Sequence, residues 1–245
     1  LDHLVVSELD AIERELAALA DPERAAHSQR FFRTEPGGYG EGDRFLGIPV
    51  PEQRRVARRH RAASLADCER LLESPIHEHR FVALVILVER FRRADAAERE
   101  AIADLYLARR ERVNNWDLVD ASAEHLLAER ARKRPGLLDE LAASPSVWDR
   151  RIAIMTTFAY IKCGEAEPTL RLAETLLHDE HDLIHKAVGW MLREVGKRVD
   201  AGLLRSFLDR HAAEMPRTML RYAIERLPAE ERRRYMQARA GEAAR

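Results

Sequence analysis

Apolar side chains recur every three or four residues through most of this 245-residue chain, as in LVVSELDAIERELAAL and FVALVILVERF. This spacing places them on one face of an α-helix. Only 11 glycines and 10 prolines interrupt the pattern, and runs of β-branched residues are short. The sequence therefore predicts an all-helical fold.

One stretch departs from the helical spacing. Residues 35–51, EPGGYGEGDRFLGIPVP, hold five glycines between Gly37 and Gly47. Glycine and proline at this density predict a loop, with a helix resuming after Pro51. A phosphate-binding P-loop is disfavoured, because no strand precedes the glycines and no G-K-[ST] follows them. We interpret the stretch as a shaped linker.

Helix pairs recur along the rest of the chain. Five segments align with one another: LLESPIHEHRFVALVIL, RRERVNNWDLVDASAEHLL, LAASPSVWDRRIAIMTTF, LLHDEHDLIHKAVGWML and AAEMPRTMLRYAIERL. The alignment places five residues in one column: Arg80, Asp120, Arg151, Lys186 and Arg221. Their separations of 31 to 40 residues are typical of HEAT-like two-helix repeats. We predict a single domain over residues 1–245, a curved α-solenoid of five or six repeats with a frayed end at 238–245.

The column also predicts a surface. In such a solenoid the second helices line a concave groove, and basic side chains on successive helices suit a phosphate backbone. The whole chain gives no such argument, because 41 Lys and Arg nearly balance 42 Asp and Glu. The basic excess is local, over residues 183–235. An alternative stays open, in which each basic residue pairs with an acidic residue of its own repeat.

All three tryptophans lie near this column. Trp116 precedes Asp120 by four residues, so both side chains project from one face of a helix. An aromatic ring beside a carboxylate suits a cationic ligand. Trp190 lies one turn after the column residue of its segment. The alternatives are tryptophans of the core and a solvated or capping Asp120, and Trp148 fits either the core or the groove. Asn115 is interpreted as a helix cap.

Other kinds of chemistry find little support. Cys68 and Cys163 lie far apart and form no CxxC pair, which disfavours a disulfide scaffold or a zinc site. The histidines form no HExxH motif, and no GxSxG motif is present. No run of 18 uncharged apolar residues occurs, and the start of the sequence has no basic signal region. We expect a cytoplasmic monomer without membrane segment, metal or cofactor.

Five motifs, in this order, resemble the AlkD-like DNA alkylation repair family: FLGIPVPEQRR, NNWDLVDASA, VWDRRIAIM, HKAVGWMLREVGK and MPRTMLRYAIE. The resemblance runs from about residue 25 to about residue 228. Known members are bacterial DNA glycosylases with a HEAT-like fold. By position, the resemblance implies that Asp120 is the catalytic aspartate, that Trp116 and Trp190 flank the lesion, and that Arg151 lies near a phosphate. The chain departs from well-known members at Asn115, where they have a second tryptophan, and in its glycine-rich insertion.

The implied substrate is duplex DNA that carries N3- or N7-alkylated purines. Such a base is already cationic and leaves without a general acid, so the enzyme need only stabilise the oxocarbenium-like sugar with a carboxylate. We expect base excision repair chemistry that uses no lysine nucleophile and leaves an abasic site. The expected phosphate contacts are Arg80, Arg151, Lys186 and Arg221, with Arg193 and Lys197 as weaker candidates.

Two other interpretations stay open. The first is a HEAT-type protein that binds damaged or branched DNA without breaking a bond, for which Asp120 is dispensable. The second is a scaffold whose groove holds part of another protein. The first predicts DNA binding without release of a base, and the second predicts capture of a peptide or protein without affinity for DNA.

Overall fold

Helices are the only regular secondary structure along the part of the chain that the structure describes. This computed structural model describes residues 7–238, so residues 239–245 of the expected frayed end lie outside it. Within this range the only β-structure is one isolated bridge between Arg44 and Ile76. None of the helices in it is long and apolar enough to span a membrane. The expected all-helical fold class is confirmed.

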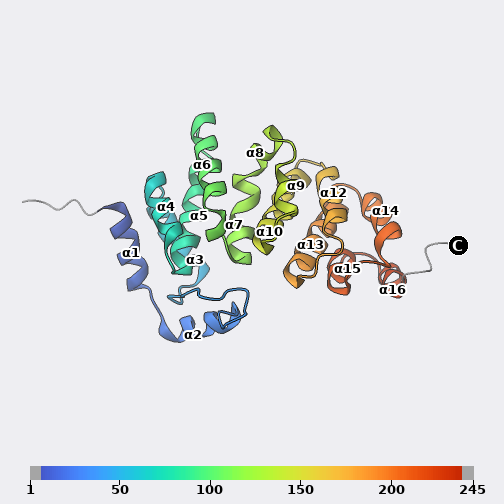
Figure 1. The fold of residues 1–245 in the computed structure, drawn as a ribbon, viewed down its shortest axis with the longest axis horizontal. Coiled ribbons are helices and arrows are strands. Elements are labelled where there is room, and N and C mark those ends of the chain that lie inside the picture. The colour runs from blue at the N-terminus through green and yellow to red at the C-terminus, as the bar shows by residue number, and fades with distance from the viewer. Residues whose placement is uncertain (1–6, 239–245) are drawn as a thin grey trace, which may run out of the picture. The chain divides into compact units, whose positions relative to one another are not determined.

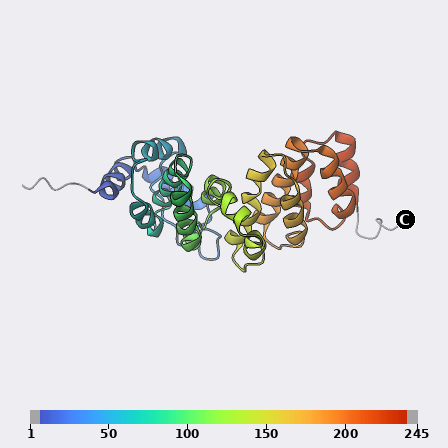
Figure 2. The ribbon, with the colours of Figure 1, turned by 90° about the horizontal axis from the view of Figure 1, so that it is seen from above.

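The helices form two compact units that divide between Ser122 and Ala123. Figures 1 and 2 show paired helices in each unit. The first unit contains α1 (Glu8–Ala18), α2 (Pro22–Phe31), α3 (Val50–Arg59), α4 (Leu65–Glu73), α5 (His77–Phe91), α6 (Ala96–Ala108), the 3-10 helix η1 (Arg110–Arg112) and most of α7 (Trp116–Leu126). The second contains α8 (Ala128–Lys133), α9 (Leu137–Ala142), α10 (Val147–Thr156), α11 (Phe158–Lys162), α12 (Glu167–Thr175), α13 (Asp182–Arg198), α14 (Ala201–His211), α15 (Arg217–Ile224) and α16 (Ala229–Gln237). The expectation of one continuous domain stays a prediction.

The first unit is built around α5. This helix is buried from His77 to Val88, because its segment FVALVILV is apolar on every face. Helices α3 and α4 both pack against it. Helix α4 begins with a capping box, in which Ser64 and Asp67 satisfy free N–H groups of the first turn. Helix α4 therefore has a defined starting point as well as an apolar face against α5.

The second unit has α13 at its centre, in contact with α10, α12, α14 and α15. Gly189 allows α13 to approach α15 closely, because a Cβ at this position would lie 2.4 Å from the carbonyl oxygen of Met219. Helix α9 packs with α10, and α12 packs with α13. These are the helix pairs that the repeat spacing predicted.

The aligned column falls on the fourth or fifth residue of five helices. Asp120, Arg151, Lys186 and Arg221 are each the fifth residue of their helices, which are α7, α10, α13 and α15. Arg80 is the fourth residue of α5. One position corresponds to about 100° around a helix axis. The alignment therefore matches four helices and is one residue out of step at Arg80.

The glycine-rich segment is a loop between α2 and α3, residues 32–49. Helix α3 begins at Val50 rather than after Pro51, because a proline fits in the first turn of a helix, where its missing N–H needs no partner. Gly47 has a φ of 82°, and a Cβ there would lie 2.2 Å from the carbonyl oxygen of Asp21. Glycine is required where the loop passes the start of α2.

The first turn of α5 holds this loop in place. Glu78 is 2% exposed, and its carboxylate accepts hydrogen bonds from the backbone N–H groups of Leu46, Gly47 and Ile48 at 2.8 to 3.3 Å. Hydrogen bonds to a charged acceptor are stronger than those between neutral groups. Glu78 therefore fixes the second half of the loop against α5.

Candidate active site

The two residues expected to carry the chemistry, Trp116 and Asp120, lie one turn apart at the start of α7. Both are partly buried. The spacing of four residues places the indole and the carboxylate on one face of the helix. Asn115 holds the start of α7, because its Oδ1 accepts a hydrogen bond from the backbone N–H of Trp116 at 2.8 Å. This is a cap on the first N–H group, whereas a usual N-cap binds the second or third.

A cluster of aromatic side chains supports Trp116. Phe32 stacks on Trp116 with ring centroids 5.4 Å apart and ring planes 25° apart. Phe45 stacks on Phe32 in turn at 5.0 Å, and Phe31 meets Trp116 edge-on at 6.2 Å. Rings from α2 and the glycine-rich loop therefore hold the indole in one orientation. Sequence reasoning missed these residues, and the paired phenylalanines before the loop were the available signal.

A buried charge network connects the loop to α7. The Nε2 atom of His77 lies 2.7 Å from Oδ2 of Asp117, and its Nδ1 atom lies 3.3 Å from Oδ2 of Asp43. The guanidinium of Arg80 donates a hydrogen bond to the other carboxylate oxygen of Asp43 at 2.7 Å. The loop residue Asp43 and the α7 residue Asp117 are therefore bridged by the first residue of α5.

The network determines the protonation of its members. Burial by itself would lower the pKa of His77, but the charge of Asp117 and hydrogen bonds to both carboxylates outweigh burial and raise this pKa to about 9. Burial would raise the pKa of Asp43, but the hydrogen bond from His77 and the charge of Arg80 outweigh it and lower this pKa. At neutral pH, His77 is therefore protonated, with Asp43 on one side of its ring and Asp117 on the other.

Arg80 is not accessible to DNA, which corrects its expected role as a phosphate contact. Its side chain is 0% exposed. The guanidinium donates hydrogen bonds to Asp43 and, at 2.9 Å, to the carbonyl oxygen of Ser74. The physical reason is its position in α5. Arg80 is the fourth residue of its helix, whereas the other column residues are the fifth of theirs, and at this position the side chain points into the core of the first unit. Arg80 is a structural residue.

The basic residues expected to bind phosphate in the second unit differ in exposure. Arg221 and Lys197 are exposed, and within residues 7–238 neither side chain forms an ion pair. Lys186 is partly exposed and pairs with an aspartate one turn earlier at 2.8 Å. Arg193 is paired with a glutamate at the end of α15. Arg151 is 5% exposed and donates a hydrogen bond to a backbone carbonyl at the start of α13 at 2.6 Å.

Trp190 has an aromatic neighbour in the second unit, and two cations lie over the ring of that neighbour. Its ring centroid lies 6.0 Å from that of Phe158. Two cations face the same phenyl ring, Lys162 with its Nζ at 4.3 Å and Arg198 with its guanidinium carbon at 5.3 Å from the centroid. Sequence reasoning missed Phe158 and Lys162, although their four-residue spacing was a visible signal. Trp148 is partly buried on α10.

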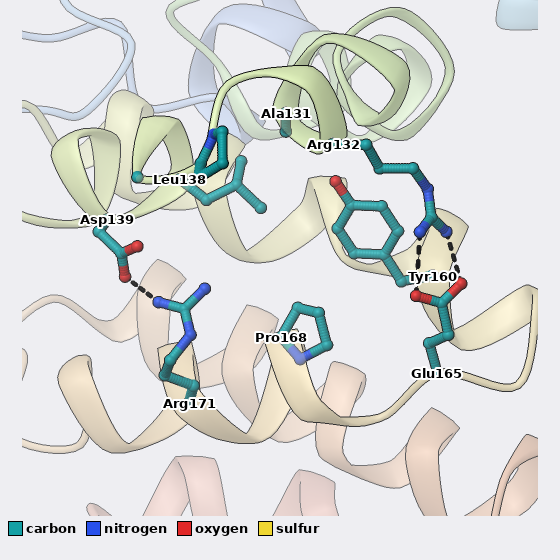
Figure 3. A pocket seen from close by; sticks show the side chains of 10 residues that line it. Ala131, Arg132, Leu138, Asp139, Tyr160, Glu165, Pro168 and Arg171 are labelled. Carbon is teal, nitrogen blue, oxygen red and sulfur yellow. Dashed lines mark hydrogen bonds and ion pairs between the residues drawn. The ribbon is translucent and has the colours of Figure 1, made fainter.

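The second unit also contains a pocket of about 490 Å³, formed by residues of α8, α9, α11 and α12 and the loops between them. Figure 3 shows Arg132 facing Glu165 beside the ring of Tyr160, with hydrogen bonds of 3.0 and 2.6 Å between the two charged groups. Arg171 pairs with Asp139 in the same pocket. The charged groups that line the pocket therefore form ion pairs with one another.

Within residues 7–238, no group of three or more His, Cys, Asp or Glu residues is placed to hold a metal ion.

Comparison with known proteins decides the family. Residues 12–227 match the family model of the DNA alkylation repair enzymes. The chain belongs to this family. A solved structure described as a predicted DNA alkylation repair enzyme from Enterococcus faecalis is similar to it, with a TM-score of 0.68 and 18% identity over 86% of this chain and 97% of that one. At this identity the likeness shows the fold alone. No curated protein matches the chain.

Membership of the DNA alkylation repair family indicates the general function. The match extends from α1 to α15 and includes α7, α10, α13 and the glycine-rich loop. It therefore covers Trp116, Asp120 and Trp190 together with the basic residues of the second unit. The role of this chain is in DNA alkylation repair.

Proposed function

We propose that this DNA alkylation repair protein is a monofunctional DNA glycosylase that removes N3- and N7-alkylated purines from duplex DNA. The observation that carries the proposal is the placement of Trp116 and Asp120 one turn apart at the start of α7. An electron-rich ring beside a carboxylate suits a substrate with positive charge on its base and, during the reaction, on its sugar. The proposal includes a monomer that acts without metal or cofactor.

An N3- or N7-alkylated purine is a good leaving group. Alkylation at N3 or N7 gives the purine a positive charge, so cleavage of its bond to C1′ sends the electron pair to the base and releases it neutral. The deoxyribose left behind has oxocarbenium character. A carboxylate held near C1′ lowers the free energy of this state, most strongly where water is excluded.

Asp120 is the proposed carboxylate. Besides stabilising the sugar, it accepts a hydrogen bond from a water molecule and orients that water toward C1′. The water oxygen then bonds to C1′ while the water loses a proton to the carboxylate or to solvent. The products are the free base and an abasic site. No amine attacks C1′, so no covalent protein–DNA intermediate forms and the strand stays intact.

The aromatic support of Trp116 favours a role in recognition. Because Phe32 and Phe45 already hold the ring, the indole loses little conformational freedom when DNA binds. Packing of the indole against the lesion nucleotide favours a cationic nucleotide over an intact one by about 0.5–2 kcal/mol. Trp190 is the proposed second aromatic contact with the DNA.

The proposed phosphate contacts are Arg221 and Lys197, supported by their exposure, and Lys186, which is partly exposed and exchanges its aspartate partner for a phosphate. Arg193 is a weaker contact, because a glutamate competes for its guanidinium. Arg151 contributes through the small exposed part of its side chain. These residues contact the backbone, so the binding they supply is independent of base sequence and weakens with salt.

The proposal is tested by release of free 7-methylguanine and 3-methyladenine from methylated duplex DNA, separated by chromatography. The intact protein is expected to release both bases, and Asp120→Asn to be slower by about a hundredfold or more, the scale of a lost electrostatic contact to the transition state. Asp10→Asn, an exposed position on α1, is the matched control and keeps full activity. Equal DNA binding by the intact protein and Asp120→Asn, with no base released by either, overturns the proposal in favour of a non-catalytic DNA-binding protein.

A further inference from the structure

The C-terminal end of α2 presents an exposed aromatic side chain beside Trp116. Phe31 is 56% exposed, the highest value among the large apolar residues within 7–238. Its ring meets Trp116 edge-on, with centroids 6.2 Å apart and ring planes 70° apart. The same ring meets Phe32 edge-on at 5.0 Å and stacks on His27 at 6.4 Å between ring centroids. Its exposed part extends the aromatic surface of Trp116 toward solvent.

The glycine-rich loop holds this end of α2 by its backbone. The hydroxyl of Tyr39 donates a hydrogen bond to the carbonyl oxygen of Phe31 at 3.2 Å, and the N–H of Gly40 donates one to the carbonyl oxygen of Arg33 at 3.2 Å. A Cβ on Gly40 would lie 2.3 Å from the carbonyl oxygen of Phe32. Only glycine permits this approach. The loop therefore fixes the position of the main chain of residues 31–33.

The glycine-rich loop is itself held in place by α5. The three hydrogen bonds to Glu78 hold residues 46–48, and Asp43 lies between His77 and Arg80. The end of α2 is thus bound to a loop that is itself held at Asp43 and at residues 46–48. A segment held in this way loses less conformational entropy on binding a ligand than a free segment does. The end of α2 is therefore preorganised, although it lies at the surface.

Two arginines flank Phe31 in the sequence. Arg30 is the last residue before it in α2, and Arg33 follows Phe32 with a φ of 52°, a left-handed conformation that non-glycine residues seldom adopt. Both are exposed, and within residues 7–238 neither side chain forms an ion pair. An exposed aromatic residue with an exposed arginine on either side of it in the sequence has the chemistry of a nucleic-acid contact, in which a ring stacks and the cations bind phosphate.

We infer that Arg30, Phe31 and Arg33, which we call the α2 tip, form a second DNA-contacting element beside Trp116. Phe31 packs on a base or deoxyribose next to the lesion, and the two arginines bind adjacent phosphates. The glycine-rich loop serves to hold the α2 tip in position. The inference rests on the proposed function, because it takes DNA as the ligand of the surface that includes Trp116.

The stacking contact is tested with a short duplex that carries one tetrahydrofuran abasic-site analogue, which binds without turnover. Phe31→Ala is expected to raise Kd by about fivefold to a hundredfold, the range for losing one base–aromatic stack. Phe31→Tyr keeps the ring and is expected to bind within about twofold of the intact protein. Leu203→Ala removes an exposed apolar side chain from α14 and is expected to leave Kd unchanged.

The phosphate contacts are tested by the salt dependence of the same Kd. The double variant Arg30→Gln, Arg33→Gln is expected to reduce the slope of log Kd against log salt by about two, because each phosphate contact contributes about 0.9. The control is Arg58→Gln, Arg61→Gln, which removes the same charge from two exposed arginines, one in the last turn of α3 and one just after it. An equal change of slope in the two double variants overturns the phosphate contacts.

Failure of this inference is separable from failure of the proposed function. If the intact protein releases methylated bases while Phe31→Ala binds the duplex with unchanged Kd, the α2 tip does not contact DNA and the glycosylase stands. If no base is released but Phe31→Ala and the Arg30, Arg33 variant weaken binding as expected, the α2 tip is a DNA contact of a non-catalytic protein. Circular dichroism of each variant confirms that the helices are retained.

Discussion

The Nε2 atom of His77 lies 2.7 Å from Oδ2 of Asp117, the residue that directly follows Trp116. The other ring nitrogen of His77 faces Asp43 in the glycine-rich loop. One protonated imidazole therefore links the loop, the first turn of α5 and the first turn of α7. This arrangement couples the stability of the first unit to the position of Trp116, and its consequences are measurable.

We expect His77→Gln to lower the free energy of unfolding by about 3 kcal/mol at pH 6, because two carboxylates lose a buried cationic partner. The folded state keeps the proton of His77 up to about pH 9, whereas the unfolded chain loses it near pH 6.5. The stabilisation is therefore complete below pH 6.5 and is lost as the pH rises toward 9. Urea unfolding of both proteins between pH 6 and pH 9 measures this. A difference that grows with pH contradicts the assignment.

We expect Glu78→Gln to loosen the second half of the glycine-rich loop and to lower the free energy of unfolding by about 2 kcal/mol, because three backbone N–H groups lose a charged acceptor. Hydrogen exchange of the amides of residues 46–48 should become faster, while exchange in α13 is unchanged. Glu89→Gln, which removes a partly exposed ion pair on the same helix, is the control and should change stability by less than about 1 kcal/mol. Equal protection of the loop in both variants would show that Glu78 does not hold it.

We expect Gly47→Ala to be more destabilising than Gly42→Ala. Both glycines have φ values near 82°, so both substitutions carry a backbone strain of about 1–2 kcal/mol. At Gly47 the added Cβ also meets the backbone of Asp21 and Ala25 at 2.2 and 2.4 Å, whereas at Gly42 nothing lies within 4 Å. Thermal unfolding of the two variants isolates the cost of that contact, and equal melting temperatures would contradict the close approach of loop and α2.

We expect Arg221→Gln and Lys197→Gln each to weaken binding to any duplex and to reduce the salt slope of log Kd by about one. Stability should change by less than about 0.5 kcal/mol, because both side chains are exposed. Arg80→Gln is expected to behave in the opposite way, with lower stability and an unchanged salt slope in the folded fraction. Fluorescence anisotropy over a series of salt concentrations, together with urea unfolding, separates these effects.

Periodicity was sufficient to predict the helices and much of their order. The column of Asp120, Arg151, Lys186 and Arg221 falls on the fifth residue of four successive second helices, because a repeat that buries the same face must place its polar residues at the same position. Arg80 lies one residue earlier and is buried. The spacing of apolar residues does not reveal this shift, because α5 is apolar on every face and its first residue has no side-chain cap.

The support of Trp116 could not be predicted in the same way. His77, Asp43 and Asp117 are far apart in the sequence and interact through a loop whose path depends on glycine conformations. No periodic pattern specifies such a path. The adjacent Phe31 and Phe32 were a signal for an aromatic cluster, but the contact of Phe32 with Phe45 was not predictable, because these rings meet across the loop rather than along one helix. Sequence identified the helix that carries the candidate site and missed what orients it.

The glycine-rich loop is held largely through main-chain atoms: the N–H groups of residues 46–48, the N–H of Gly40 and the carbonyl oxygens of residues 31 and 33. Side chains such as Glu35 and Arg44 are exposed and take no part in these bonds. The path of the loop is thus nearly independent of their identity. The residues at those positions are therefore free to change, and with them the surface charge of the loop, as long as its glycines, Tyr39, Asp43 and Phe45 persist.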